Sequence, residues 1–590
     1  MDRFGNRLNI VMRLVPVACT VFLLVTGSSG CRPSDGVVPT EFRRGHTELT
    51  ESEHFHKAFD LLRRLEEFDA EQAMAQVAYH INRWLQEQPK PGDWVADPML
   101  GDSSLGALRR LPSLVRLDKR EVSVRDVLYL RENRWLRDLA EWVPDGPVPI
   151  DLASWLQDKT KHMPREEAQR LGAAVKLFDW TVRHVQLDAL SDWPDSSPQK
   201  LPAERAEPGP GYDLYPWECL LLGHGDAWQR ARVFMLLLRQ VSIPSVLLAV
   251  DRPESPFGPV PWAVGVLIGQ ELYLFDPELG LAIPTGEDQG IATLAEVIRK
   301  PDLLRRLDIS QSLRYRIQAE DLEHLVALID ASSEALSLRM RLIERQLTGE
   351  HRMVLTIDAS GLKRQIEGIS GITAVRLWRI PLDAELFSQA YQEQRRRDSR
   401  LEDQYRAERY MFSGLSPLMQ ARQLHFRHRF EPWENRPGAV AKYMEVRQPE
   451  AQIAKLPTDV DLQRQFGLQQ RPGEPVELWQ ARLAGSQQAL RTARYHASYF
   501  LGLLHYDNGD YESAANWLRK RTLEDSPESP WRNGARYNLA RAEEARGNFQ
   551  AAREAYLLDE SPQRHGNLLR ARWIRLHAPA SGSSNAETSP

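Results

Sequence analysis

The stretch of residues 223–250 limits the fold of this chain more than any other segment. It reads GHGDAWQRARVFMLLLRQVSIPSVLLAV, which is a glycine turn, a long apolar run and a second apolar run after Ile243-Pro244. The first run has the length of a helix and few polar positions, so it predicts a buried helix. A residue that precedes proline favours extended backbone, so Ile243 marks the entry to a strand. A buried helix joined to a strand predicts an α+β fold.

Segments on both sides of this stretch agree with an α+β fold. Residues 164–187 predict a long amphipathic helix, with a proline and acidic residues at its start, where the helix dipole favours negative charge. Residues 261–277 (PWAVGVLIGQELYLFDP) predict a β-hairpin that turns at Gly269-Gln270. Residues 292–298 predict a further helix.

Three short motifs follow one another in this region. Gly225 opens a turn of the form G-x-A-x-x-x-A, Pro261 stands in the first hairpin strand, and Asp276 precedes a proline after the second. This order resembles the transglutaminase-like branch of the papain-like cysteine hydrolases, whose turn reads G-x-C-x-x-x-A and whose histidine and aspartate lie on the two strands. The resemblance implies a transglutaminase-like α+β domain over residues 161–300. In it, Ala227, Pro261 and Asp276 take the places of the catalytic triad.

The catalytic groups of that family are missing. Its chemistry needs an activated thiol, a histidine base and a carboxylate that orients the histidine. Ala227 has no nucleophilic atom, Pro261 has no base, and Asp276 has nothing to orient. Residues 223–241 contain no Cys, Ser or Thr and residues 245–276 contain no His, so a shifted alignment does not restore them. The resemblance therefore implies a pseudoenzyme, and Asp276 is equally explained as a residue that caps a turn.

Two alternative roles remain for residues near these positions. Cys219 and His224 meet if their segment bends, which would give a thiol-dependent hydrolase or acyl transferase acting on peptide or cell-wall material. Their ordinary explanation is a buried cysteine and a turn histidine. Trp228, Trp262 and Phe275 either line what remains of the active-site groove or belong to the core.

The first 30 residues have the pattern of a secretory signal. Three arginines precede an apolar run at residues 14–25, which is too short to span a bilayer as a helix. The sequence GSSG then leads to Cys31. This resembles a bacterial lipobox, except that Ser28 stands where that motif prefers leucine. We expect export to the cell envelope or periplasm, lipidation of Cys31 as a membrane anchor, and a polar tether over residues 31–50; the alternative for Cys31 is a free thiol.

The charge and cysteine content give no reason to expect nucleic acid, a metal or a cofactor. The chain has 81 acidic and 76 basic residues and a net charge of −5, without the concentrated basic field that phosphate binding needs. No HExxH or CxxC pattern occurs. Cys19 lies in the signal segment, so lipidation of Cys31 leaves Cys219 without a disulfide partner.

The C-terminal part contains an internal repeat over residues 485–577. Gly509-Asp510-Tyr511 aligns with Gly547-Asn548-Phe549, a period of 38 residues, and small residues align on both sides. Each unit predicts two antiparallel helices that turn at the glycine. The pattern resembles tetratricopeptide repeats, which implies an α-solenoid that binds a protein or peptide partner. Residues 578–590 predict a disordered tail.

The two remaining regions are described only by their periodicity. Residues 51–160 predict a mostly helical region. In residues 301–480 we expect a helical and mixed α/β region, with a helical pattern at residues 312–345. Strand-like segments at residues 351–358 and 374–381 flank a short helix, which predicts a small α/β element.

Three functions are compatible with these patterns. The first is a non-enzymatic envelope protein with an inactive transglutaminase-like domain and a protein-binding repeat domain. The second is the enzyme that uses Cys219 and His224. The third is an envelope scaffold in which the transglutaminase-like domain only spaces the repeats.

Overall fold

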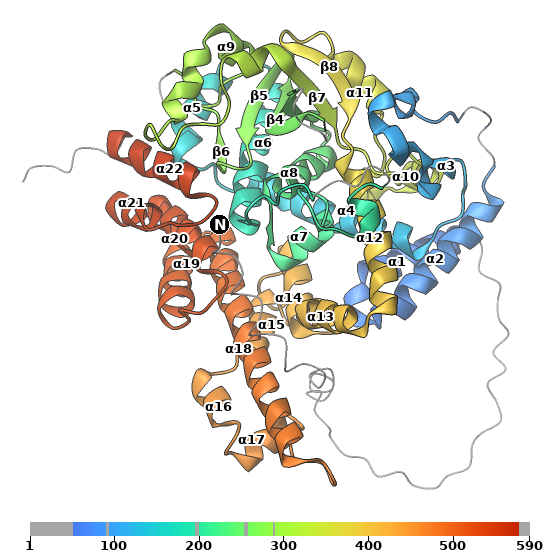
Figure 1. The fold of residues 1–590 in the computed structure, drawn as a ribbon, viewed down its shortest axis with the longest axis vertical. Helices are drawn as coiled ribbons and strands as arrows, with labels where there is room; N and C mark the ends of the chain where they lie inside the picture. Colours follow the sequence, from blue (N-terminus) through green and yellow to red (C-terminus); the bar gives the residue numbers. More distant parts are fainter. Residues whose placement is uncertain are drawn as a thin grey trace, which may run out of the picture.

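The computed structural model describes residues 51–89, 92, 94–194, 200–252, 258–286 and 290–577. The signal segment, Cys31, the tether and the tail of residues 578–590 lie outside this part of the chain. Among the described residues, none of the helices combines the length and the apolar character needed to cross a membrane. The described chain is a helix-rich α+β protein, as the sequence predicts (Figure 1).

A mixed six-stranded sheet forms the centre of the fold (Figure 1). Its strands lie in the order β6-β5-β4-β3-β7-β8, and all neighbours are antiparallel except β7 and β8. The predicted hairpin is confirmed as β4 and β5, and its turn contains Gly269 at φ 61°. The strands are β3 (Ser245–Val250), β4 (Val260–Ile268), β5 (Glu271–Asp276), β6 (Leu281–Ala282), β7 (Leu325–Ile329) and β8 (Ile372–Leu377).

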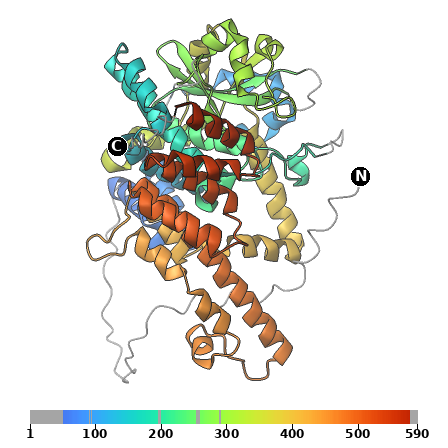
Figure 2. The same cartoon turned by 90° about the vertical axis from the view of Figure 1, so that its left-hand side faces the viewer.

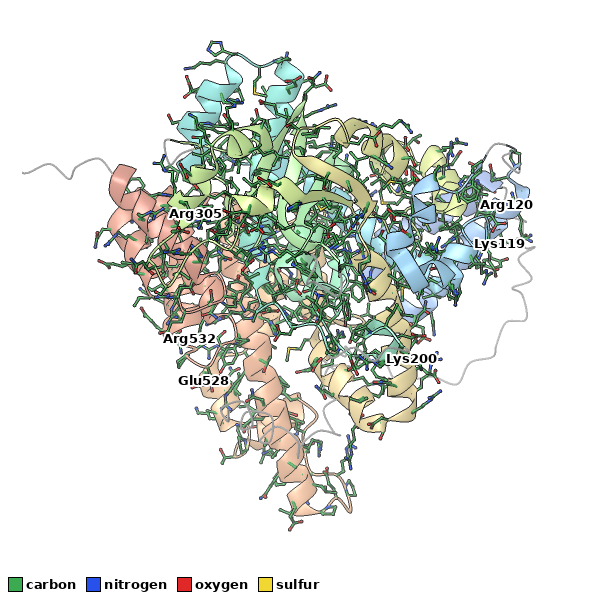
Figure 3. The ribbon with its side chains drawn as sticks, turned by 45° about the horizontal axis from the view of Figure 1, so that its top comes forward. Lys119, Arg120, Lys200, Arg305, Glu528 and Arg532 are labelled. Carbon is green, nitrogen blue, oxygen red and sulfur yellow. The ribbon has the colours of Figure 1, made fainter. Side chains whose placement is uncertain are left out.

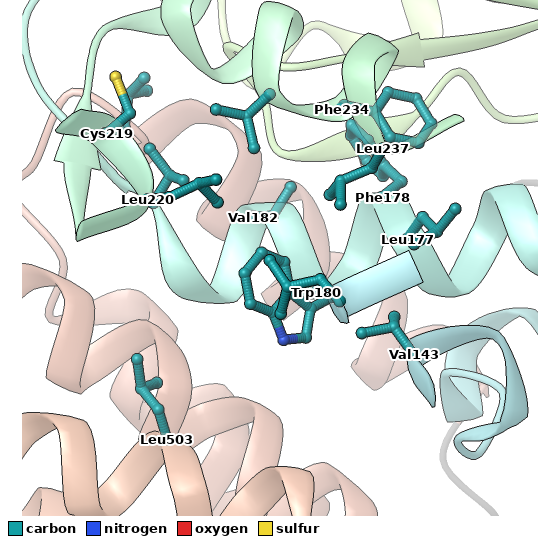
Figure 4. Packing of buried hydrophobic residues seen from close by; sticks show 14 of the residues in the cluster. Val143, Leu177, Phe178, Trp180, Val182, Cys219, Leu220, Phe234, Leu237 and Leu503 are labelled. Atoms are coloured by element: carbon teal, nitrogen blue, oxygen red, sulfur yellow. The ribbon is translucent and has the colours of Figure 1, made fainter. Parts of the chain in front are cut away.

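The predicted buried helix and the predicted amphipathic helix are confirmed as α8 (Ala227–Gln240) and α6 (Arg165–His184). Both pack on one face of the sheet, and their apolar side chains share a core with it. The rings of Phe178 on α6 and Phe234 on α8 lie 5.1 Å apart, and Figure 4 shows the packing around them. We call the sheet with α6 and α8 the sheet body.

The other face of the sheet carries a second core. Helices α9 (Leu294–Arg299) and α11 (Ala359–Ile366) contribute to it, and α9 confirms the helix predicted at residues 292–298. Between β3 and β4 the register shifts, so that Trp262 is an extra residue on β4. This irregularity accounts for the side chain of Trp262 lying in the second core rather than beside α8.

The helix predicted over residues 312–345 is wrong for most of its length. The strand β7 lies inside it, and α10 (Leu338–Gln346) is its only α-helix. The strand reads LVALI without alternation because both of its faces are buried. A short apolar run of this kind cannot be distinguished from a buried helix by its period.

The strand predicted at residues 351–358 is absent. Its backbone bonds go to side chains instead: the N–H of Val354 donates to Gln240 Oε1 at 3.0 Å, and the next two N–H groups donate to the carboxylate of Glu344. The strand predicted at residues 374–381 is confirmed as β8. It pairs with β7 in the main sheet, so these residues do not form a small element of their own.

The helical prediction for the N-terminal region is confirmed, and α1 and α2 pack together on α4 and α10 in a core of their own. Further helices connect β8 to the repeats. The helices of these two regions are α1 (Glu51–Arg63), α2 (Ala70–Glu87), α3 (Pro112–Val115), α4 (Val124–Trp142), α5 (Ile150–Thr160), α12 (Ile380–Arg397), α13 (Ser399–Arg409), α14 (Pro417–Phe426), α15 (Ala439–Val446), α16 (Glu450–Lys455) and α17 (Val460–Gln465).

The repeat region forms the antiparallel helix pairs that its period predicts. The turns contain Gly509 and Gly547 at φ 76° and 78°, a left-handed conformation that favours glycine. The second helix of the first pair, α19, continues into a π-helical segment at residues 517–524. The C-terminal helices are α18 (Val476–Asp507), α19 (Tyr511–Asn516), α20 (Arg532–Ala545), α21 (Phe549–Leu557) and α22 (Arg564–His577).

The C-terminal helices stack along one side of the sheet body (Figures 1 and 2). Apolar side chains of α18 and α20 belong to the same core as those of α6 and α8. Gln563, next to the start of α22, accepts a hydrogen bond from the buried Arg230 at 2.8 Å. One face of the repeat helices is therefore buried within the chain itself. Figure 3 labels charged side chains on separate parts of the molecule, with Lys119 and Glu528 on opposite sides of the view.

Candidate functional site

Ala227 begins α8, and the residue before it closes the helix end. The carboxylate of Asp226 accepts hydrogen bonds from the N–H groups of Trp228 and Gln229, both at 2.9 Å, and from that of Gly211 at 2.7 Å. Burial raises the pKa of Asp226 to about 7 despite these bonds. In a thiol enzyme, N–H groups at such a helix end can stabilise a thiolate or an oxyanion. Here the N–H groups of Trp228 and Gln229 are already bonded to Asp226.

Trp228 and Pro261 lie in the wall of one pocket of about 310 Å³, which we call the Trp228 pocket. Trp228 is almost fully buried, and its ring lies 6.1 Å from that of Trp193. The pocket has aromatic and apolar residues beside polar ones. Its wall includes Trp193, Trp228, Pro259, Pro261, Trp378 and Ile380, together with Ser104, Arg376 and Arg379.

Asp276 is bonded on the opposite side of the sheet. Its Oδ2 accepts a hydrogen bond from the hydroxyl of Tyr315 at 2.5 Å, and that hydroxyl accepts one from Trp262 Nε1 at 2.7 Å. Its Oδ1 caps the following turn through the N–H groups of Glu278 and Leu279. Tyr315 and Trp262 belong to the second core, which contains no residue of α8. Asp276 therefore acts as a turn cap within a buried tyrosine–tryptophan network.

The three groove candidates are not brought together. Trp228 alone lines the pocket beside Ala227, whereas Trp262 is 1% exposed in the second core. Phe275 is fully buried between the rings of Phe178 and Phe234, at 5.0 and 5.4 Å. The aromatic pocket beside α8 instead gains Trp193 and Trp378, which lie far from the motifs in sequence.

Cys219 and His224 also have separate surroundings. The thiol of Cys219 on α7 (Pro216–Leu222) is fully buried, and burial with nearby carboxylates raises its pKa well above the usual value. A nucleophilic thiol needs the opposite shift. His224 Nδ1 lies 2.6 Å from Asp188 Oδ2; burial lowers the pKa of His224, but the bond to Asp188 outweighs it and the net pKa is raised.

One cluster has the residue types of a metal site. His184, His425 and Asp507 place one ligand atom each within 4.8 Å of one another. Asp507 Oδ2 lies 2.8 Å from His184 Nε2 and 3.1 Å from His425 Nε2, and Oδ1 accepts from Arg183 at 2.7 Å. Burial lowers the pKa of His184 to about 3 and also lowers the pKa of His425, and both imidazoles lie against the same carboxylate. With a guanidinium on the same carboxylate, the cluster is an internal hydrogen-bond network that joins α6, α14 and α18.

A further cavity lies between α4 and α12, with a volume of about 650 Å³. We call it the α4–α12 cavity. Its wall also takes residues from the segment 206–215, α7, α8 and α13. No local sequence motif predicts this cavity, because its wall residues come from six separate segments that meet only in the folded chain.

Comparisons with known proteins give no relative for this chain: no family model, no curated protein and no solved structure matches it. The fold itself defines the class as a helix-rich α+β protein with a mixed sheet.

Proposed function

We propose that this chain is a non-enzymatic cell-envelope protein that binds a peptide at an inactive transglutaminase-like site and a protein partner through tetratricopeptide-like helices. The observation that carries the proposal is the end of α8, where Ala227 and Pro261 stand beside an aromatic pocket. Ala227 offers no nucleophile and Pro261 offers no base, whereas a pocket walled by tryptophans and prolines can hold an apolar side chain.

The partner-binding part of the proposal is supported by the outer surface of the repeats. Leu557 and Leu558 at the end of α21 are 44% and 65% exposed, in a chain that buries most of its large apolar side chains. Exposed aliphatic side chains next to each other mark a surface that gains from being covered. A peptide at the Trp228 pocket and a protein at α21 therefore have separate places on the molecule.

The peptide site is tested by panning a library of random linear peptides on the purified protein. Titration calorimetry of selected peptides is expected to show a large loss of affinity in Trp228→Ala, and also in Ser104→Trp, which fills the pocket from an exposed position. Trp262→Phe is the matched control, because Trp262 lies in the other core. Binding that survives both pocket variants contradicts the proposal.

A thiol enzyme based on Cys219 and His224 remains the alternative, and one measurement separates the two functions. A protein that starts after Cys31 carries Cys219 as its single thiol. We expect native Cys219 to resist alkylation across the pH range and to react fully only after unfolding. Fast labelling with an apparent pKa well below about 8.5 contradicts the non-enzymatic function.

The envelope location rests on the signal-like N-terminus and is tested by lipid labelling. Metabolic labelling with a fatty acid is expected to mark the protein, and Cys31→Ser is expected to abolish the label. A protein that carries no lipid and stays in the cytoplasm contradicts this part of the proposal.

A further inference from the structure

Aromatic side chains line much of the α4–α12 cavity. They come from helices on both sides of it and from the segment that leads into α7. A volume of about 650 Å³ lies within the range of roughly 300–1,000 Å³ that is usual for small-molecule sites. The aromatic residues are Tyr129, Tyr212, Tyr215, Trp217, Phe387, Tyr391 and Tyr405.

Most charged groups on the cavity wall are neutralised by the protein. Each guanidinium from α4, α12 and α13 has a carboxylate as its partner. The pairs are Arg125 with Glu334 at 2.7 Å, Arg395 with Glu402 at 2.7 Å and Arg409 with Glu218 at 3.1 Å. These pairs have no need of a ligand.

Glu132 on α4 is different. It is 6% exposed, and the one hydrogen bond it accepts among the described residues comes from the N–H of Trp217 at 3.0 Å. Burial raises the pKa of Glu132 to about 7, and the nearby charge of Arg232 does not compensate. A buried carboxylate with one neutral donor leaves most of its acceptor capacity unused.

Arg232 on α8 faces the same cavity and is also incompletely bonded. It is 4% exposed, and its Nε donates to Asp330 Oδ2 at 2.9 Å. Within the described chain its Nη1 is buried without any partner, and its Nη2 makes no hydrogen bond. Glu132 and Arg232 influence each other electrostatically, but they form no ion pair with each other.

We propose that the α4–α12 cavity binds a free α-amino acid, with its ammonium group on Glu132, its carboxylate on Arg232 and its side chain among the aromatic residues of the wall. The charge of Arg232 is offset by Asp330, but its Nη1 lacks an acceptor, and Glu132 lacks a charged donor. A zwitterion supplies the carboxylate oxygen and the ammonium group at once, whereas a simple amine or a simple carboxylate supplies only one of them. Buried polar groups without hydrogen-bond partners are unfavourable, so the two residues favour a ligand that carries both groups.

The test is titration calorimetry of the purified protein with each of the twenty common amino acids. At least one is expected to bind with a Kd of millimolar or tighter. Its N-acetyl and carboxamide forms, which each lack one charge, are expected to bind at least about tenfold more weakly. The same loss is expected for Glu132→Gln and for Arg232→Met, while Glu477→Gln on the exposed start of α18 serves as the matched control.

A second variant protects the test against simple misfolding of buried-charge variants. Gln392 lies on the cavity wall at an exposed position of α12, so Gln392→Trp fills the entrance without disturbing the core. It is expected to weaken amino-acid binding as well. The proposal is overturned if none of the twenty binds, if the blocked forms bind equally, or if Gln392→Trp has no effect.

The site is independent of the peptide pocket. Trp228→Ala is expected to leave amino-acid binding unchanged, because Trp228 lies outside the wall of the α4–α12 cavity. Loss of amino-acid binding in Trp228→Ala contradicts a separate site, whereas loss of peptide binding alone leaves it intact.

Discussion

Buried charges of α18 and α20 contact buried charges of α5 and α6 where the C-terminal helices meet the rest of the fold, and we call this contact the joint. It can be compared with the α4–α12 cavity, because both contain buried charges. In the joint, Arg541 is bonded to Asp151, Asp179 and Glu544, and Asp507 is bonded to Arg183 and two histidines. In the cavity, Glu132 accepts one hydrogen bond and forms no ion pair, and Arg232 is paired with Asp330 but keeps one buried guanidinium nitrogen without a partner.

The difference suggests a way to separate structural charges from candidate binding groups where comparisons match no known protein. The desolvation of a buried charge has to be offset by a partner. In the joint the partner comes from the chain itself, and the charges then specify how two layers of the fold fit together. In the cavity Glu132 has no charged partner, and the proposed ligand supplies one.

The largest effect is expected from breaking the joint. Asp507→Ala removes the acceptor shared by Arg183, His184 and His425, and breaking a buried pair costs about 3–5 kcal/mol. Urea unfolding measures the change in the free energy of unfolding. The matched control is Asp510→Ala, which removes the helix cap of α19 and a partly exposed contact with His505 at 3.5 Å, and is expected to cost about 1 kcal/mol. An equal or smaller loss in Asp507→Ala shows that the joint is not held by its charges.

An intermediate effect is expected from Glu132→Gln, and it depends on pH. The folded protein holds a proton on Glu132 up to a pKa of about 7, whereas the unfolded chain releases it near 4.5. The native state therefore binds more protons in this window, and the free energy of unfolding falls as the pH rises through it. One pKa unit corresponds to about 1.4 kcal/mol, so the rise from 4.5 to about 7 makes the loss at high pH at most about 3.5 kcal/mol.

The measurement is the free energy of unfolding of both proteins between about pH 5 and about pH 8. Glu132→Gln is expected to flatten the decline and to be the more stable protein at the alkaline end. Asp226 contributes a decline of its own in both proteins, because burial raises its pKa to about 7 as well, so only the part that comes from Glu132 disappears in the variant. If the two proteins show the same pH dependence of the unfolding free energy, the buried carboxylate of Glu132 does not destabilise the fold when it ionises. The cavity then does not differ from the joint in this respect.

The smallest effect is expected at a pair near the surface. His224 and Asp188 are bonded, but their side chains are 37% and 43% exposed, so solvent screens them. His224→Ala is expected to cost about 0.2–1 kcal/mol in urea unfolding. Because the pKa of His224 is raised, this small contribution is present below about pH 6.5 and is lost as the pH rises further. A loss of unfolding free energy as large as that of Asp507→Ala would mean that the exposure of an ion pair does not decide how much it stabilises the protein.

The sequence allowed the elements with strong local signals to be predicted. The helix α8, the hairpin and the two glycine turns of the repeats follow from period, proline and glycine positions. It did not allow β7 to be predicted, because LVALI is apolar on both faces and its partner β8 lies more than forty residues further along. Pairing between distant strands leaves no mark in a local pattern.

The same limit explains the candidate sites. Trp228 was identified because it sits next to the glycine turn, but the register shift that moves Trp262 to the other core has no sequence signature. Glu132 and Arg232 look like ordinary charged helix residues in the printed sequence. Their unusual state depends on burial and on missing partners, which are properties of the folded chain alone.

The close contact between α22 and the sheet body affects when this protein can finish folding. A Cβ atom at Gly566 would lie 1.7 Å from the carbonyl oxygen of Leu279, so the last helix rests directly on the backbone of the turn after β5. Leu569 of the same helix completes the second core. Part of the second core therefore stays uncovered during synthesis until α22 has been made. A nascent chain of this kind depends on protection during synthesis, and loss of α22 alone would expose it to proteolysis.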